Sequence, residues 1–361
     1  AKKEKVDFTF VGPDNPLALG IVDEFQKAGL RIFGPTRAAA EIEWSKAYAK
    51  QFMLEEGIPT AGHKIFDTAE TARQYIQTQK LPLVIKADGL AEGKGVVVAQ
   101  SIEEAEKAIE NIMETKTFGD SGNQIVIESY LEGTEISVHA FCDGENISMF
   151  PSSKDHKRIF DGDTGPNTGG MGTIAPVASI NAHQMELIRE KIILPTLAGL
   201  KKRGRAFSGI LYPGIMLTKE GPMVIEFNAR FGDPETQSYM RLLETDLFDI
   251  LYACATGTLE NIEVKWSELS ACCVVLAAEG YPGAYEKGLE ITVPQDSGGV
   301  VVFHAGTTTK DKKFVTNGGR VLGVTATGKT LQEALDVAYK AVNKNRFEGS
   351  QYRTDIGASV L

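Results

Sequence analysis

The chain has 361 residues, and its 38 lysines and arginines against 48 aspartates and glutamates give a net charge of −10. This length predicts two to three domains with sizeable cores. The acidic balance argues against a general nucleic-acid binder or a membrane-surface protein, because phosphate attracts net positive charge. The longest apolar stretch, at 271–278, is far shorter than the roughly 20 residues that span a bilayer. The four cysteines include no C-x-x-C pair, which favours a reduced cytosolic protein without a disulfide framework or zinc site.

The first elements predict a parallel α/β domain. A buried strand is expected over 6–11, a helix with apolar residues at helical spacing over 17–28, and a short strand over 31–33. Strand, turn, helix and strand in this order are typical of such a domain. A longer helix is expected over 36–56, and it ends at Gly57.

The middle of the chain alternates helices and strands. Ser101-x-x-Glu104 is a capping box, and it predicts a helix that begins directly after Ser101. The other elements expected here are a helix capped by Asp67 or Thr68 that runs to Gln79, a strand over 83–87, a strand over 124–130, and β segments that continue to Ser153.

The second half opens with a long glycine-rich loop. Residues 154–176 include few apolar side chains, and loops of this length inside a compact domain are usually functional. The elements expected after the loop are a helix over 182–202, strands over 209–217 and 223–228, short β segments from Ser270 onward, and a closing helix over 331–343.

A glycine-rich loop between two strands is the strongest local signal. Lys86-Ala-Asp-Gly-Leu-Ala-Glu-Gly-Lys-Gly95 joins the strand at 83–87 to a second apolar strand. Backbone N–H groups and lysine ammonium groups of such a flap can close over a polyphosphate. The alternative is a plain β-hairpin with solvated lysines. Three glycines and two lysines within ten residues favour the phosphate flap.

The second signal is an alternating polar strand. Glu226 and Asn228 are two residues apart, so both side chains project from one face of the strand. Two oxygen ligands on one rigid face suit a hard cation such as Mg²⁺, which keeps waters and phosphate oxygens as its other ligands. Arg230, at the strand end, can hold a carboxylate or phosphate with two hydrogen bonds. The alternative is a solvated edge strand, but Ile225 and Phe227 indicate that the other face is buried.

The third signal lies in the glycine-rich loop. The basic cluster Ser153-Lys-Asp-His-Lys-Arg158 precedes Asp163-Thr-Gly-Pro-Asn-Thr-Gly-Gly-Met-Gly172, and together they can bind a small anion while excluding water. His156 is one of five histidines, and a lone histidine is more often structural, so its assignment depends on these neighbours. The segments 128–131 and 132–135 end a strand that leaves the flap, where a hinge can offer backbone groups to an adenine edge.

Together these motifs resemble the glycinamide ribonucleotide synthetase family of the ATP-grasp superfamily. The resemblance covers essentially the whole chain. Among ATP-grasp ligases, DTGPNTGGMG and FNARFGDPE in one chain are specific to this family. The further matching motifs are Gly12-Pro-Asp-Asn-Pro-Leu17, Phe33-Gly-Pro35, Ser45-Lys46, His304-Ala-Gly-Thr307 and Thr316-Asn-Gly-Gly-Arg-Val321.

The resemblance implies a multidomain α/β and α+β protein with an ATP-grasp fold, a partial N-terminal parallel α/β domain and a C-terminal β-rich domain. It implies a carbon–nitrogen ligase that converts ATP, glycine and 5-phosphoribosylamine to ADP, phosphate and glycinamide ribonucleotide through glycyl phosphate, in purine biosynthesis. The implied domains are the remainder of an acceptor-binding domain at 1–43, a central ATP-grasp domain at 44–62 and 131–265, a flap domain at 63–130 and the C-terminal domain at 266–361.

The family's residue roles carry over to matching positions of this chain. Those implied for ATP are Lys46, Lys86, Gly89, Gly93, Lys94, Gly95, Glu128, Leu131 and Glu135. Those implied for Mg²⁺ or Mn²⁺ are Glu226 and Asn228. Those implied for catalysis are Arg230, Asn167, Gly170 and Asp155. Those implied for substrate binding are Asp14, His156, Lys157, Arg158, Thr168, Gly169 and Asp233. The implied partners are small molecules, without nucleic acid or membrane, and the protein is expected to be a cytoplasmic monomer or weak oligomer.

The chain departs from the family pattern at several places. Glu92 replaces an alanine of the flap, Asp14 stands where glutamate is common, and Trp44 replaces a small residue. The family also begins with a strand and a glycine-rich turn upstream of Ala1, and that turn is expected to bind the acceptor phosphate. A protein limited to residues 1–361 is therefore expected to bind ATP but to form glycinamide ribonucleotide poorly.

Two interpretations of the function stay open at this point. The first is an active ligase, and the alternative is a nucleotide-binding fragment without full ligase activity. An ATP-grasp ligase for another carboxylate and amine is disfavoured by the two specific motifs.

Overall fold

The computed structural model describes residues 1–90, 95–292 and 298–361, which form two compact units. Unit 1 contains Ala1–Phe150, Ala182–Phe231 and Leu247–Glu263, and unit 2 contains Pro151–Asn181, Gly232–Asp246 and Val264–Leu361. This division into two units does not test the domain boundaries predicted from the sequence, which stay a prediction. Within the described ranges, no helix has the length and apolar character of a membrane span.

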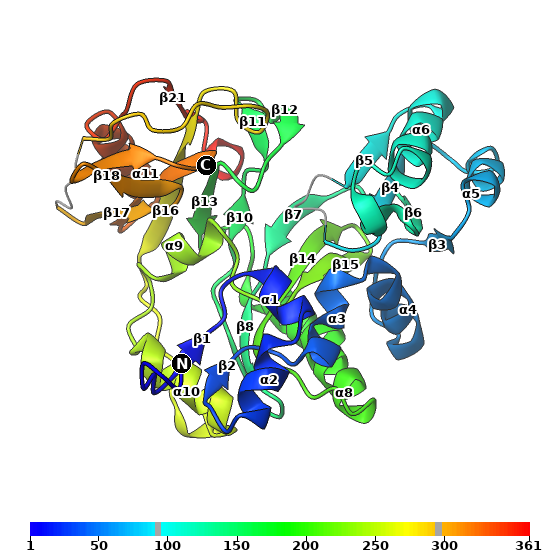
Figure 1. Cartoon of the computed structure of the whole chain (residues 1–361), viewed down its shortest axis with the longest axis horizontal. Helices are drawn as coiled ribbons and strands as arrows, with labels where there is room; N and C mark the ends of the chain where they lie inside the picture. The colour runs from blue at the N-terminus through cyan, green and yellow to red at the C-terminus, as the bar shows by residue number, and fades with distance from the viewer. Residues whose placement is uncertain (91–94, 293–297) are drawn as a thin grey trace. The chain divides into compact units, whose positions relative to one another are not determined.

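Unit 1 begins with a small parallel pairing flanked by helices (Figure 1). β1 (Thr9–Phe10) pairs in parallel with β2 (Ile32–Phe33), as the order of strand, helix and strand predicts. The single helix predicted between them is instead two helices, α1 (Asp14–Ala18) and α2 (Ile21–Lys27). Gly20 interrupts them with a φ of 85°, a left-handed conformation that glycine adopts without steric strain.

The next predicted helix is also divided in two. α3 (Arg37–Trp44) ends and α4 (Lys46–Glu56) begins at Ser45, whose φ of −121° and ψ of 108° are extended rather than helical. The Ser45 hydroxyl accepts a hydrogen bond from the Tyr48 N–H and so caps α4. Gly57, with a φ of 67°, ends α4 as predicted.

The strands on either side of the predicted flap belong to a four-stranded antiparallel sheet in unit 1, with the order β3-β6-β4-β5. Its strands are β3 (His63–Phe66), β4 (Leu83–Ala87), β5 (Val96–Ala99) and β6 (Ile125–Ser129). Two helices, α5 (Ala69–Ile76) and α6 (Ile102–Ile109), share its apolar core. The Ser101 hydroxyl accepts a hydrogen bond from the Glu104 N–H, which confirms the predicted cap of α6. A π-helical turn, Glu110–Glu114, follows α6.

The second sheet of unit 1 has the order β15-β14-β8-β9, with β7 paired to β14. Its strands are β7 (Thr134–Ser137), β8 (Ala140–Asp143), β9 (Ile147–Met149), β14 (Ser208–Thr218) and β15 (Gly221–Asn228). β14 and β15 form the predicted hairpin. The helices of this region are α7 (Ala182–Ile188), a π-helical turn (Arg189–Ile193), α8 (Leu194–Lys202) and α10 (Leu247–Thr256).

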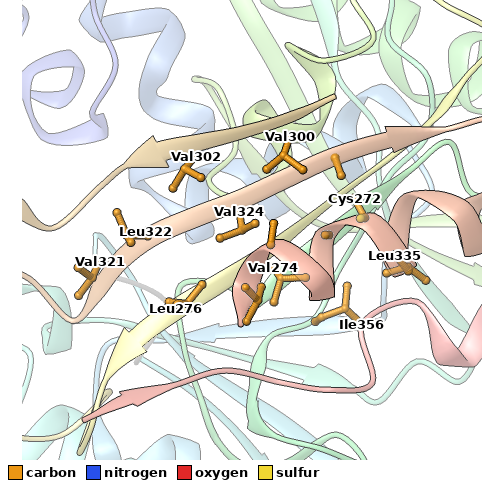
Figure 2. Close-up of a cluster of buried hydrophobic side chains, with 14 of the residues drawn as sticks. Cys272, Val274, Leu276, Val300, Val302, Val321, Leu322, Val324, Leu335 and Ile356 are labelled. Atoms are coloured by element: carbon orange, nitrogen blue, oxygen red, sulfur yellow. The ribbon is translucent and has the colours of Figure 1, made fainter. Parts of the chain in front are cut away.

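Unit 2 is built on a sheet with the order β10-β13-β16-β20-β17, with β21 paired to β16. Its strands are β10 (Lys154–Asp155), β13 (Gly172–Ala175), β16 (Ser270–Ala278), β17 (Val300–His304), β20 (Arg320–Gly328) and β21 (Ser350–Gln351). The closing helix α11 (Leu331–Val342) packs on this sheet. Figure 2 shows the apolar core that joins Val274 of β16, Val324 of β20 and Leu335 of α11. A separate hairpin is formed by β18 (Thr307–Lys310) and β19 (Lys313–Thr316), and α9 (Glu235–Tyr239) is a short helix.

The long loop predicted over 154–176 is largely strand. β10 and β13 lie within it, and β11 (Arg158–Phe160) pairs with β12 (Thr164–Asn167) as a hairpin. The prediction of a loop was wrong because each strand is only two to four residues long, too short to show an alternating apolar pattern.

Candidate functional site

Three buried charged residues lie together in unit 1, and two of them, Lys86 and Glu128, were predicted for the nucleotide. Lys86 of β4 is only 3% exposed, and its Nζ lies 2.9 Å from Glu128 Oε1 and donates to the Ile225 carbonyl at 3.0 Å. Lys50 of α4 approaches from the other side, with its Nζ 2.9 Å from Glu128 Oε2. Two ammonium groups thus share one carboxylate. One positive charge is left in excess within this trio, which a polyphosphate can neutralise.

The trio is anchored through Lys50. Lys50 Nζ donates to Thr60 Oγ1 at 2.6 Å, and Thr60 Oγ1 donates to the Val224 carbonyl at 2.7 Å. Burial lowers the pKa of Lys50 to about 8, although Glu128 opposes this shift. Burial alone would raise the pKa of the Glu128 carboxyl, but the two lysines outweigh it and hold the pKa below its usual value. Glu128 therefore stays a carboxylate at neutral pH.

The first turn of α4 is tied to the segment that follows β4. Lys46 Nζ donates to the Gly89 carbonyl at 3.0 Å. Asp88 Oδ1 accepts from the Ala47 N–H at 2.9 Å and from the Ser45 hydroxyl at 3.3 Å. The helix break at Ser45 therefore places Lys46 at the start of the glycine-rich flap.

The other residues predicted for the nucleotide are spread over the same unit. Gly95 directly precedes β5, Leu131 follows β6, and Glu135 lies in β7; Leu131 and Glu135 are half-buried. The predicted residues outside the described part of the chain are Gly93 and Lys94, together with the departure at Glu92. The nucleotide roles of all these residues stay predictions.

β15 carries both predicted metal ligands. Glu226 borders the recess that the lysine–glutamate trio also lines. Asn228 Oδ1 accepts from Arg230 Nη2 at 3.1 Å, and Asn228 Nδ2 donates to the Tyr212 carbonyl at 3.3 Å. Among the described residues, no three His, Cys, Asp or Glu side chains gather as a metal site. One carboxylate and one amide fit a cation that takes its remaining ligands from phosphate and water.

Arg230 is oriented by a glutamate that the sequence did not point to. Glu43 of α3 is buried, and its Oε1 lies 3.1 Å from Arg230 Nε while its Oε2 accepts from the Ala229 N–H at 2.9 Å. Burial raises the pKa of Glu43, against the lowering effect of Arg230. Arg230 Nη1 also donates to the Phe231 carbonyl at 3.2 Å. Asp14, predicted for the acceptor, is half-buried at the start of α1.

The predicted catalytic aspartate of unit 2 packs against a glycine. Gly170 has a φ of 113°, and a Cβ there would lie 2.6 Å from Asp155 Oδ1 and 2.4 Å from Pro234 Cδ. Only glycine fits this position. Burial and the neighbouring Glu235 raise the pKa of Asp155 well above its usual value.

The loop after β12 lies beside the basic cluster. Asn167 pairs with Arg158 across the β11–β12 hairpin. The Thr168 N–H and hydroxyl both donate to the Lys157 carbonyl at 2.8 Å, and Thr168 Oγ1 accepts from the Gly170 N–H at 2.9 Å. The structure therefore brings together the parts of the third motif that the sequence predicted as one anion site.

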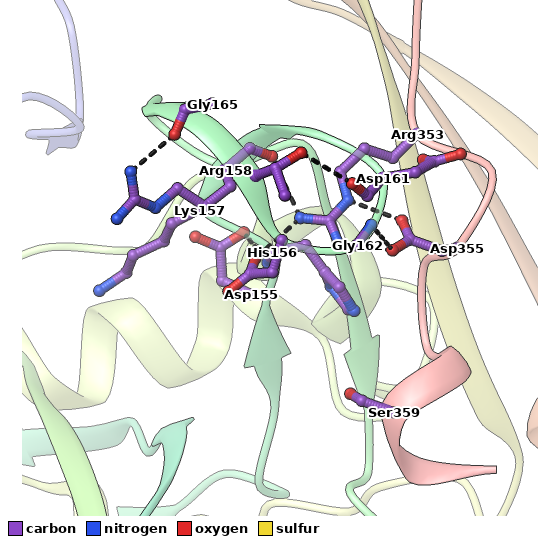
Figure 3. A network of polar contacts seen from close by, with 12 residues as sticks. Asp155, His156, Lys157, Arg158, Asp161, Gly162, Gly165, Arg353, Asp355 and Ser359 are labelled. Carbon is purple, nitrogen blue, oxygen red and sulfur yellow. Dashed lines mark hydrogen bonds and ion pairs between the residues drawn. The ribbon is translucent and has the colours of Figure 1, made fainter. Parts of the chain in front are cut away.

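His156 occupies a different environment from the one predicted (Figure 3). Its ring is buried, Nδ1 lies 3.0 Å from the Gly172 carbonyl, and Nε2 lies 3.0 Å from the Gly357 N–H. These partners define a neutral ring that donates from Nδ1 and accepts at Nε2. Burial lowers the pKa of His156 to about 4. With both nitrogens engaged, the geometry favours a structural role over the predicted substrate contact.

Residues near the C-terminus reinforce this part of unit 2 (Figure 3). Arg353 donates to both oxygens of Asp355, at 2.7 and 2.8 Å, and to Asp163 Oδ1 at 3.0 Å. It also donates to the Arg158 carbonyl at 3.1 Å, and Asp355 Oδ2 accepts from the Gly162 N–H at 2.8 Å. These bonds fasten the segment after β21 to the β11–β12 hairpin.

Acidification should weaken unit 2 through His156. In the unfolded state the pKa of His156 has its ordinary value of 6.5, whereas in the native state it is about 4. The contribution of the neutral ring to the unfolding free energy is therefore complete above pH 6.5 and is lost as the pH falls towards 4. Between pH 7 and pH 5 we expect His156 to remove about 2 kcal/mol of unfolding free energy. In His156→Gln this contribution should vanish.

The measurement is urea unfolding followed by the fluorescence of Trp266, which lies in unit 2, in a Trp44→Phe background. The matched control is His304→Gln, because His304 is exposed in the same unit and should leave the pH dependence unchanged. Equal pH dependence in His156→Gln and the parent protein would contradict the neutral, buried ring.

Three profiles of one family match successive parts of the chain. They are the N domain of phosphoribosylglycinamide synthetase at residues 1–43, its ATP-grasp (A) domain at 44–236 and its C domain at 271–359. The chain belongs to the phosphoribosylglycinamide synthetase family. This confirms the resemblance that the motifs indicated.

Other members of the phosphoribosylglycinamide synthetase family are similar over nearly the whole chain. Phosphoribosylamine–glycine ligase of Caldanaerobacter subterraneus subsp. tengcongensis is 48% identical over 358 residues, which are 99% of this chain and 86% of that protein. The ligase of Chlorobaculum tepidum is 49% identical over 363 residues, which are 99% of this chain and 85% of that protein.

Solved structures confirm the ATP-grasp multidomain fold. The crystal structure of phosphoribosylamine–glycine ligase from Thermotoga maritima is 42% identical, with a TM-score of 0.84, and covers 90% of this chain and 81% of that one. A biotin carboxylase from Campylobacter jejuni, titled as a β,γ-ATP complex, is 17% identical with a TM-score of 0.77, and covers 99% of this chain and 79% of that one. At that identity the second likeness concerns the fold alone.

In this member of the phosphoribosylglycinamide synthetase family, several residues that contact the predicted site residues were not identified from the sequence. They are Glu43, Lys50, Arg320 and Arg353. Lys50 alone left a signal, because it follows Lys46 by four residues and so shares its face of the helix. Arg320 lies within a motif that matched the family, but no pattern linked it to Gly169 and Asp233, both of which it contacts.

Proposed function

We propose that this protein joins glycine to 5-phosphoribosylamine with cleavage of ATP, giving glycinamide ribonucleotide, ADP and phosphate in purine biosynthesis. The observation that carries the proposal is the match of the N, ATP-grasp and C domains of one family along one chain. The similar curated proteins are named phosphoribosylamine–glycine ligase. The alternative is a fragment that only binds nucleotide. It is not favoured, because the N and C domains of the family match this chain in addition to the ATP-grasp domain.

The proposed chemistry has two steps. A carboxylate oxygen of glycine attacks the γ-phosphorus of ATP, the bond to the bridging oxygen breaks, and ADP leaves as glycyl phosphate forms. The amine of phosphoribosylamine then attacks the acyl carbon, the C–N bond forms, and phosphate leaves with the former carboxylate oxygen as the amine loses a proton. Positioning and neutralisation of charge on the phosphoryl group provide most of the catalysis in such transfers.

We assign the nucleotide to residues of unit 1. Lys46 Nζ donates to the Gly89 carbonyl after β4, and the trio of Lys86, Lys50 and Glu128 has positive charge in excess. Both features suit phosphate oxygens. The further nucleotide contacts in this proposal are Gly89, Gly93, Lys94, Gly95, Leu131 and Glu135.

We assign the metal, Mg²⁺ or Mn²⁺, to Glu226 and Asn228. When bound beside ATP, such a cation neutralises charge on the phosphate oxygens. Arg230, whose guanidinium Glu43 orients, would hold the carboxylate of glycine or its acyl phosphate with two N–H groups. The proposed role of Glu43 is therefore to keep this guanidinium in place.

We assign the remaining substrate contacts as the family pattern implies. Those for the acyl phosphate and glycine are Asn167, Thr168, Gly169, Gly170 and Asp233, and those for the acceptor are Asp14, Asp155, Lys157 and Arg158. His156 would support them from within the fold. We further propose a cytoplasmic monomer or weak oligomer, in keeping with the four free, buried cysteines and the acidic balance.

The test is product formation by the purified protein. With ATP, Mg²⁺, glycine and freshly made 5-phosphoribosylamine, we expect glycinamide ribonucleotide, ADP and phosphate in equal amounts by mass spectrometry. Omission of either glycine or the amine should abolish the ribonucleotide. ADP production without the ribonucleotide in the complete mixture would contradict the proposal.

A further inference from the structure

One arginine at the start of β20 joins two segments that are distant in sequence. Arg320 Nη1 donates to the Gly169 carbonyl at 2.7 Å and to the Asp233 carbonyl at 2.7 Å. Its Nη2 forms an ion pair with Asp233 Oδ2 at 3.0 Å. Gly170 offers its carbonyl to Nη1 at a longer 3.4 Å. One guanidinium therefore connects the glycine-rich loop with the segment that precedes α9.

The close approach of this guanidinium depends on glycine. A Cβ at residue 169 would lie 2.9 Å from Arg320 Cζ, so a larger residue would displace the guanidinium. The Gly169 N–H donates to the Tyr281 hydroxyl at 3.0 Å, which holds the loop from a second direction. The residue before the arginine, Gly319, also needs its small size, because a Cβ there would lie 2.1 Å from Tyr281 Cδ2. Gly169 therefore packs on Arg320, and Gly319 packs on Tyr281, whose hydroxyl accepts the hydrogen bond from Gly169.

The chemistry of the contact requires arginine rather than any cation. A planar guanidinium presents several N–H donors in a fixed fork, and here one nitrogen serves two carbonyls while a second serves a carboxylate. A lysine ammonium is a single point on a flexible chain, and it does not reproduce this arrangement. Arg320 also acts on Asp155, because its charge opposes the rise that burial causes in the pKa of that carboxyl.

We propose that Arg320 is a positioning residue for the glycine end of the reaction: it holds the loop with Gly169 and the segment with Asp233 in the one arrangement that binds glycine and its acyl phosphate. The inference rests on the proposed function, which assigns those two segments to substrate. Arg320 comes from the C-terminal part of the chain, outside the residues assigned to ATP, metal or substrate. Its loss should therefore affect glycine far more than the nucleotide, whose assigned residues are in unit 1.

The test compares Arg320→Ala and Arg320→Lys with Arg346→Ala, an exposed arginine of unit 2 that contacts Asn343 Oδ1. In Arg320→Ala the kcat/KM for glycine should fall about 100-fold, because small displacements of positioning groups have effects of this size. Most of the fall should be a rise in the KM for glycine, while the Kd for ATP changes less than about twofold. Arg320→Lys should recover only a minor part of the loss, and Arg346→Ala should match the parent protein.

A second readout does not depend on turnover. Amide hydrogen exchange of peptides that contain residues 167–172 and 232–234 should be faster in Arg320→Ala than in Arg346→Ala, without glycine or ATP present. If Arg320→Ala does not fold, the same glycine KM and exchange measurements on Arg320→Lys decide the matter, since that substitution keeps the charge.

The outcomes separate the inference from the proposed function. If the parent protein makes no glycinamide ribonucleotide, the proposed function fails. If the parent is active but Arg320→Ala keeps the KM for glycine within about twofold, the inference alone is overturned. It is also overturned if turnover falls while the glycine KM stays unchanged, or if ATP binding weakens as much as glycine binding, because those results indicate a general structural loss.

Discussion

Replacing Glu226 by alanine should lower ligase turnover on the order of 100- to 1,000-fold, because a lost source of transition-state charge stabilisation is worth a few kcal/mol and each ~1.4 kcal/mol is tenfold in rate. Glu226 is a half-buried residue of β15, and it borders the recess of the lysine–glutamate trio. Its carboxylate and the Asn228 amide are the two protein oxygens proposed for the metal. The fold should persist, since the β14–β15 ladder is made by backbone groups.

The matched control for this prediction is Glu220→Ala. Glu220 lies in the turn of the same hairpin and is exposed, so its loss should leave turnover unchanged. Steady-state rates are measured over a Mg²⁺ titration, with the melting temperature of each variant as a check on folding. Near-normal turnover of Glu226→Ala at saturating Mg²⁺ would remove Glu226 from the metal site.

Replacing Glu128 by glutamine should destabilise unit 1 by about 3–5 kcal/mol, the usual result of leaving a buried charge without its partner. In this case two ammonium groups, those of Lys50 and Lys86, lose their shared carboxylate. The two ammonium groups would then face each other inside the protein. The exposed ion pair of Glu114 with Arg73 is the matched control, and Glu114→Gln should lower stability by no more than about 1 kcal/mol.

The pH dependence distinguishes a charge effect from a packing effect. Because the native pKa of Lys50 is about 8 against an ordinary 10.5, the unfolded state binds more protons between these values and stability rises with pH there. Without Glu128, which raises the pKa of Lys50, the rise should begin at a lower pH. Part of the loss in Glu128→Gln should therefore be regained between pH 7 and pH 9.

Unit 1 unfolding can be followed separately from unit 2. Trp44 is one of two tryptophans and lies in unit 1, so its fluorescence in a Trp266→Phe background reports that unit during urea unfolding. If the unfolding free energy of Glu128→Gln falls by less than about 1 kcal/mol at pH 7, Glu128 does not neutralise the two buried lysines.

The elements that could be predicted from the sequence are those with strong local signals. β15 alternates over most of its length and follows β14 after a turn with glycine, and α6 and α11 have amphipathic patterns behind capping residues. Local chemistry decides such elements, so no knowledge of the fold was needed. The helix breaks at Gly20 and Ser45 were missed because the apolar spacing continues across both of them.

The supporting residues of the site could not be predicted, since their partners are distant in sequence. Arg320 reaches Gly169 over 151 residues and Asp233 over 87 residues. Glu43 meets Ala229 over 186 residues. A buried charge is noticeable only when its burial is known, and the sequence shows such residues as ordinary polar positions of helices and strands.

His156 shows how the surroundings of one member of a motif can differ from those of its neighbours. Its neighbours in the Asp-His-Lys-Arg run are half-buried, whereas the imidazole is turned into the fold and bonded at both nitrogens. His156 and Lys157 lie between the end of β10 and the start of β11, so the run does not have the regular alternation of one strand, and its side chains have different surroundings. We therefore expect His156 to support the proposed substrate residues rather than to contact substrate, and its role stays a prediction.

The most direct test of the ligase account is the fate of the glycine oxygens. The protein is incubated with ATP, Mg²⁺, 5-phosphoribosylamine and glycine labelled with ¹⁸O in both carboxylate positions, and the phosphate released is analysed by mass spectrometry. The account predicts one labelled oxygen in each phosphate and the other retained in the amide of glycinamide ribonucleotide. Phosphate without label, formed together with ADP, would mean that water rather than the glycine carboxylate receives the γ-phosphoryl group, and the account would be contradicted.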